Sequence, residues 1–141
     1  MSTLGHAVMF TIGGQTFAMD LNHVKSIEPY KNENSSAEGL VLGYSDIRGE
    51  QAVVVDLQNF LYDQPFSVTE TTRLLYVETG QVPYAIPFEE AEMINGTNVE
   101  KQDLGLAQSK ENTFFSSVVL WNDQLVPVID AFALSDSLNL V

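Results

Sequence analysis

The chain has 141 residues, 45% of them hydrophobic, which is enough for one domain or for two very small ones that share a core. Nineteen acidic residues against six basic ones give a net charge of −13, a field that repels nucleic-acid phosphates and anionic lipid surfaces. There is no cysteine, which excludes disulfides and thiolate chemistry and is typical of a reducing compartment. No lysine or arginine precedes Lys25 and no aliphatic or aromatic run exceeds four residues. We therefore expect a cytoplasmic protein without a secretory signal or an inserted segment.

Four segments share one pattern, in which an apolar run, a tight turn and a second apolar run follow one another. In chain order they span residues 9–21, 47–55, 74–86 and 118–129, and each turn contains Gly, Asn or Asp. Alternating apolar residues and β-branched runs interrupted in this way are typical of β-hairpins. The sequence therefore predicts a mainly β protein.

Two short helices are expected, one directly after the second hairpin and one after the fourth. Asp56 and Asp130 each follow a strand, where a carboxylate can accept the free N–H groups of a first helical turn. Polar linkers cover residues 31–38, 63–72 and 97–113, and the middle one is the best internal boundary.

The two halves of the chain repeat each other. Aligning the Gly-Gln pair at 14–15 with that at 80–81 places residues 17–19 on 84–86 after a one-residue slip, and residues 53–56 match 127–130. This predicts an internal duplication, with a first barrel over about 10–62 and a second over about 74–134. Each half holds about five short strands, which suit a small closed barrel. We expect the two five-stranded barrels to share a hydrophobic core, and strand exchange between them is compatible with this.

Few residues carry the signals of chemistry. His6 and His23 lack the spaced partners of a metal site, so no metal or cofactor is predicted. Asp56 and Asp130 form a symmetric carboxylate pair, which suggests a small hydrolase as a hypothesis of another class. Their positions between a strand and a helix favour capping instead, so no catalytic residue is assigned.

Residues 43–49 read Gly-Tyr-Ser-Asp-Ile-Arg-Gly and are followed at 54–57 by Val-Val-Asp-Leu. Together with the strands at 10–15 and 24–27, they resemble the CheW-type coupling proteins of bacterial chemotaxis. The resemblance covers about residues 6–135. It implies two SH3-like five-stranded barrels around a shared core, and a non-catalytic adapter between chemoreceptors and a histidine kinase.

Carried over by position, the resemblance implies a binding surface in the first half of the chain. Arg48 and Gly49 would lie at the groove that takes the helical hairpin of a chemoreceptor tip, and Val24 and Ile27 would lie on the partner-facing strand of the first barrel. The partners implied are this hairpin and the regulatory domain of a CheA-type kinase. Arg48 can bind a carboxylate or carbonyl of a partner, or stabilise its own turn. Glu50 could hold Arg48 in place or make its own contact. An adapter of the same fold that recruits another signalling, polarity or motility partner remains the alternative.

Overall fold

The computed structural model describes residues 2–30, 41–47, 49–80, 82–103 and 114–137. The strands are β1 (Ser2–Ile12), β2 (Gln15–Asp20), β3 (Val24–Pro29), β4 (Val41–Ile47), β5 (Glu50–Val55), β6 (Arg73–Val77), β7 (Tyr84–Phe88), β8 (Ala91–Asp103), β9 (Phe115–Trp121) and β10 (Gln124–Ile129). Two short helices follow β5 and β10, namely α1 (Leu57–Tyr62) and α2 (Ala131–Ser137), and a 3₁₀ turn, Leu21–His23, precedes β3.

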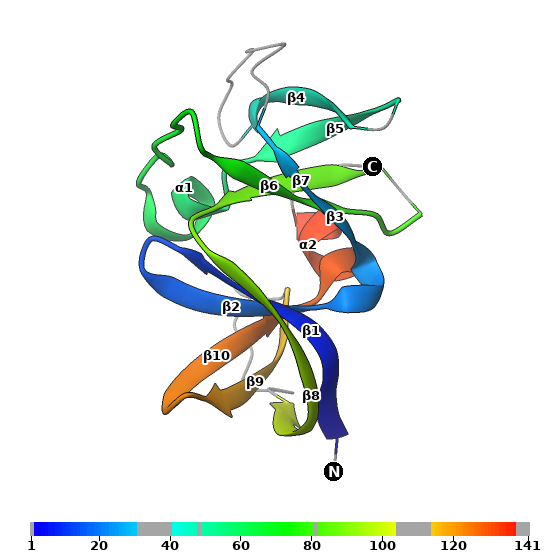
Figure 1. The fold of residues 1–141 in the computed structure, drawn as a ribbon, viewed down its shortest axis with the longest axis vertical. Helices are drawn as coiled ribbons and strands as arrows, with labels where there is room; N and C mark the ends of the chain where they lie inside the picture. Colours follow the sequence, from blue (N-terminus) through cyan, green and yellow to red (C-terminus); the bar gives the residue numbers. More distant parts are fainter. Residues whose placement is uncertain (1, 31–40, 48, 81, 104–113, 138–141) are drawn as a thin grey trace.

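The strands form two five-stranded sheets, one above the other in Figure 1. One sheet closes into a barrel in the order β1-β2-β10-β9-β8, and the second has the order β3-β6-β7-β5-β4. The prediction of a mainly β protein with two five-stranded units and short helices after strands is confirmed.

Each sheet takes strands from both halves of the chain, so residues 10–62 and 74–134 do not each build a sheet alone. The halves meet at the antiparallel pairings of β1 with β8 and of β3 with β6, and at two parallel pairings. In the parallel pairings, Ala18 of β2 lies opposite Val128 of β10 and Ala85 of β7 lies opposite Val54 of β5. The sequence repeat aligns these four residues in the same way, Ala18 with Ala85 and Val54 with Val128. The two sheets thus share one strand arrangement, and the duplication itself stays a prediction.

The two sheets differ in closure. In the barrel, β8 has 13 residues and pairs with both β1 and β9. The corresponding strand of the second sheet, β3, has six residues and ends at Pro29, and in the described residues it pairs only with β6. Proline and charged residues are typical of strands that remain at a sheet edge.

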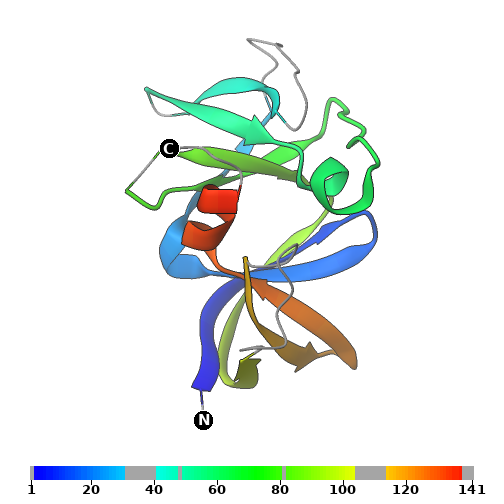
Figure 2. The same cartoon turned by 180° about the vertical axis from the view of Figure 1, so that it is seen from behind.

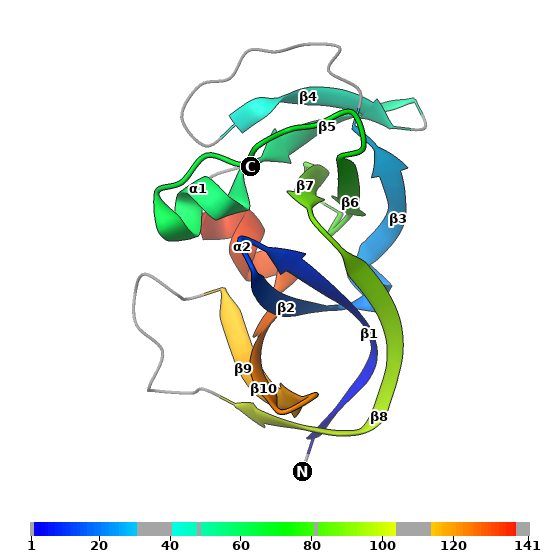
Figure 3. The same ribbon diagram turned by 60° about the vertical axis from the view of Figure 1, so that its left-hand side comes forward.

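Successive side chains of a strand point to opposite faces of the sheet, so each strand contributes apolar side chains to two different cores. On β1, Val8 and Phe10 belong to a central core between the sheets, whereas Ala7 and Met9 fill the barrel. The central core also takes Leu75 and other residues of the second sheet, which confirms the shared core. Figure 2 shows both helices beside the junction of the sheets, and Figure 3 shows β8 running from the second sheet into the barrel.

Candidate functional site

The hairpin that connects β4 and β5 carries three of the residues predicted to contact a partner. Ile47 pairs with Glu50 across this hairpin, so two residues connect the strands. Gly49 has φ +84°, and a Cβ there would meet no atom within 4 Å. A short hairpin needs positive φ in its loop, so the backbone conformation rather than lack of space requires glycine here. Arg48, the other loop residue, lies outside the described residues.

Glu50 is anchored by a tyrosine of the same sheet. Tyr76 Oη donates a hydrogen bond to Glu50 Oε2 at 2.8 Å, and the tyrosine is only 2% exposed. Ala85 of β7, the strand between β6 and β5, lies opposite Tyr76 in the register and belongs to the same apolar cluster. The bond joins a buried phenol to an anionic acceptor, which makes it stronger than a neutral one. It therefore ties the beginning of β5, and with it the hairpin, to β6.

Val24 and Ile27 lie on the edge strand β3, opposite Val77 and Leu75 of β6. Both side chains are half-buried and pack against the central core. Each of these two side chains therefore packs on the central core, and part of its surface stays accessible at the sheet edge. The neighbouring Lys25 pairs with Glu78 at 3.6 Å, and because both side chains are well exposed this ion pair adds little stability.

Asp56 and Asp130 cap the two helices, as predicted. Asp56 accepts the Asn59 N–H through Oδ1 and the Phe66 N–H through Oδ2, each at 3.0 Å, and is 2% exposed. Asp130 uses a single oxygen, Oδ1, to accept the N–H groups of Phe132 and Ala133 at 3.0 and 3.1 Å. Both carboxylates are engaged in helix capping, so the hydrolase hypothesis loses its acid–base pair.

The two histidines lie in different surroundings. His6 is exposed on β1, and His23 contacts the Phe132 ring edge-on with centroids 4.8 Å apart. Over the described ranges, no group of three or more histidine, aspartate or glutamate side chains is placed to hold a metal ion. No helix in the same ranges is long and apolar enough to cross a membrane.

Two tyrosines with structural roles were missed by reasoning from the sequence. Tyr76 and Tyr84 lie in apolar strands, and a buried phenol in such a strand needs a hydrogen-bond partner. Tyr84 donates to the Ala131 carbonyl at 2.8 Å and so joins β7 to α2. Burial, assisted by the nearby charge of Asp130, raises the pKa of Tyr84 far above its ordinary value.

Comparisons with known proteins agree with this architecture. A family model described as the CheW-like domain matches residues 6–139. Chemotaxis protein CheW of Bacillus subtilis (strain 168) is 23% identical over 134 residues, covering 92% of this chain and 85% of that protein. The crystal structure of the scaffolding protein TtCheW from Thermoanaerobacter tengcongensis superposes with a TM-score of 0.72 at 15% identity, covering 89% of this chain and 88% of that one. The structural match is evidence for the fold, and the predicted SH3-like arrangement is confirmed.

Proposed function

Because the chain belongs to the CheW-like domain family, we propose that it is an adapter that couples the cytoplasmic tips of chemoreceptors to a CheA-type histidine kinase. The observation that carries the proposal is the extent of the family match, which includes almost the entire chain and both sheets. CheW proteins are non-catalytic scaffolds, and this chain is not an enzyme. An adapter with these partners acts in the cytoplasm, as part of a chemosensory array.

We assign the partner contacts to the β4–β5 hairpin and to β3. Of the described residues of this hairpin, Gly49 has a positive φ and Glu50 is held by the hydrogen bond from Tyr76, so a partner meets a preorganised surface beside the position of Arg48. Val24 and Ile27 offer half-buried apolar surface on an edge strand of the same sheet. The receptor hairpin is assigned to Arg48 and Gly49, and the kinase regulatory domain to β3.

Reconstitution tests this proposal. The kinase, receptor-containing membranes and the purified chain, all from the same host, are mixed, and kinase autophosphorylation is followed with and without receptor ligand. We expect receptor ligand to alter kinase activity only when the chain is present. If the chain binds neither the kinase regulatory domain nor the receptor hairpin, the coupling function is refuted and the alternative adapter role takes its place.

A further inference from the structure

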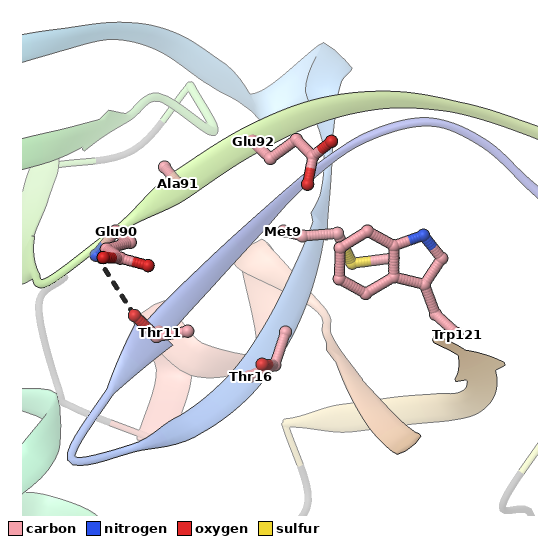
Figure 4. A pocket seen from close by; sticks show the side chains of 7 residues that line it. All are labelled: Met9, Thr11, Thr16, Glu90, Ala91, Glu92 and Trp121. Carbon is pink, nitrogen blue, oxygen red and sulfur yellow. Dashed lines mark hydrogen bonds between the residues drawn. The ribbon is translucent and has the colours of Figure 1, made fainter. Parts of the chain in front are cut away.

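The mouth of the closed barrel holds a cavity of about 220 Å³ that the proposed function does not use. Met9, Ala91 and Trp121 form its apolar surface, and Glu90 and Glu92 lie at its edge with two threonines (Figure 4). Sites that enclose whole small molecules measure roughly 300–1,000 Å³, so this cavity is better matched to a single side chain.

The alternation of the barrel strands explains why the cavity is lined in this way. Met9 faces the barrel interior, and Glu92 lies directly opposite it on β8, so both side chains are on one face of the sheet. Two residues further along β1, Thr11 lies opposite Thr16 of β2. The barrel interior is therefore apolar around Met9 and becomes polar at the end where the two threonines lie.

The cavity carries two carboxylates. Among the described residues that line it, none is basic. Within the described ranges, neither the Glu90 nor the Glu92 carboxylate has a hydrogen-bond or ion-pair partner, although the Glu90 backbone N–H donates to Thr11 Oγ1 at 3.1 Å. Figure 4 shows the Glu92 side chain extending toward Met9 and Trp121. A cation placed here would meet free carboxylate oxygens and an indole ring.

We propose that this barrel mouth binds an arginine side chain presented by a partner protein. The aliphatic stem of an arginine fits against Met9 and Ala91, and its planar guanidinium can both stack on Trp121 and bond a carboxylate in a bidentate manner. The net charge of −13 disfavours a second copy of this chain as the occupant, because two such molecules repel each other. The same charge favours encounters with a basic partner.

Trp121 provides a direct reporter, because it is the only tryptophan in the chain. Its fluorescence is followed at low ionic strength while the full chain is titrated with a short blocked peptide that contains one arginine between neutral residues. The comparison peptide carries citrulline, which has nearly the same shape without the charge. We expect the arginine peptide to change the Trp121 emission at concentrations at least several-fold lower than the citrulline peptide. Equal binding of the two peptides, or tighter binding of a lysine peptide, overturns the proposal.

Two glutamates of β8, one in the cavity and one outside it, allow a matched pair of charge-removing substitutions. Glu92→Gln removes a carboxylate from the cavity, and Glu100→Gln removes one from an exposed position of β8 that does not line it. We expect Glu92→Gln to weaken arginine-peptide binding about fivefold, which is the range of a partly exposed charge contact, and Glu100→Gln to leave it nearly unchanged. Equal effects of the two substitutions would mean that only the overall charge attracts the peptide, and would refute a specific site.

This site is separate from the proposed adapter contacts, which lie on the other sheet. Loss of kinase or receptor binding in an Arg48 variant leaves the peptide titration unaffected. Failure of the titration likewise leaves the coupling proposal unchanged.

Discussion

Tyr76 and Glu50 are joined by a 2.8 Å hydrogen bond although their strands are not neighbours, since β7 lies between β6 and β5. The bond spans β7, on which Ala85 lies opposite Tyr76 in the same apolar cluster, and reaches the first residue after the β4–β5 turn. A residue in the core of the second sheet therefore controls the geometry of the hairpin that we assign to partner contacts.

Tyr76→Phe removes this hydrogen bond while the ring stays in the core. We expect the free energy of unfolding to fall by ~1–2 kcal/mol, because the bond is charge-assisted but its acceptor is exposed and can be hydrated. Glu50→Gln should cost less, since an amide oxygen can still accept from the phenol. Urea denaturation measures both. Tyr62→Phe is the matched control, because Tyr62 is 43% exposed, and an equal loss there would contradict this account.

Substitutions of Gly49 test whether the β4–β5 turn requires the positive φ of this residue. Gly49→Ala should lower the free energy of unfolding by ~1 kcal/mol, because φ +84° is costly for a residue with a Cβ. Gly49→Asn should cost less, since asparagine tolerates this conformation better. Thermal unfolding of both variants checks the order, and a harmless alanine would show that the turn relaxes freely.

Arg48→Ala is expected to leave the melting temperature within a few degrees and to weaken receptor or kinase binding by ~1–3 kcal/mol, the range for losing a charge-assisted bond. Arg48→Lys should restore only part of the affinity, because an ammonium lacks the planar fork. Calorimetry with the isolated receptor hairpin and kinase regulatory domain measures the effect.

The control for Arg48 is Arg73→Ala, which removes the same charge from β6, where the guanidinium lies 5.2 Å from the Phe88 ring. If Arg48→Ala lowers stability by several kcal/mol and leaves the affinity of the folded protein unchanged, Arg48 is structural.

The two capping aspartates should respond differently to the same substitution. Asp56 accepts N–H groups with both oxygens, so Asp56→Asn places an amide donor against one of these N–H groups. Asp130 accepts both of its N–H groups with one oxygen, which asparagine retains. We expect a loss of ~1–3 kcal/mol for Asp56→Asn and of ~1 kcal/mol or less for Asp130→Asn. Equal losses, measured by chemical denaturation, would contradict the assigned geometry.

The raised pKa of Tyr84 predicts how the free energy of unfolding changes at alkaline pH. Its pKa is raised in the folded state, so above pH ~10 the unfolded chain loses the phenolic proton while the folded chain keeps it. The contribution of this group is fully present below pH ~10 and is lost as the pH rises further, by up to ~1.4 kcal/mol per pH unit.

Tyr84→Phe should flatten this alkaline decline in denaturation curves recorded from pH 8 to pH 12. The substitution should also cost ~1–3 kcal/mol at neutral pH, because it removes the buried hydrogen bond from the phenol to the Ala131 carbonyl. Identical alkaline slopes in the two proteins would refute the role of Tyr84.

The sequence by itself determined the features that depend on neighbours along the chain. Alternation indicated the strands, Gly and Asn-Asp pairs located the hairpin turns, and Asp56 and Asp130 were identified as caps from the strand before and the helix after. The repeat and the motif around Arg48 were sufficient for the family. All of these signals extend over a few residues or compare one segment with another.

Only the tertiary structure decided which strands of the two halves pair with each other. The parallel pairs Ala18–Val128 and Val54–Ala85 join segments far apart in sequence, and no local pattern specifies such a partner. The exchange is selected because both sheets must bury their apolar faces against one shared core, a requirement of the whole chain. For the same reason the Tyr76–Glu50 bond and the meeting of Met9, Glu92 and Trp121 at the barrel mouth arise from packing across strands, which the order of residues does not reveal.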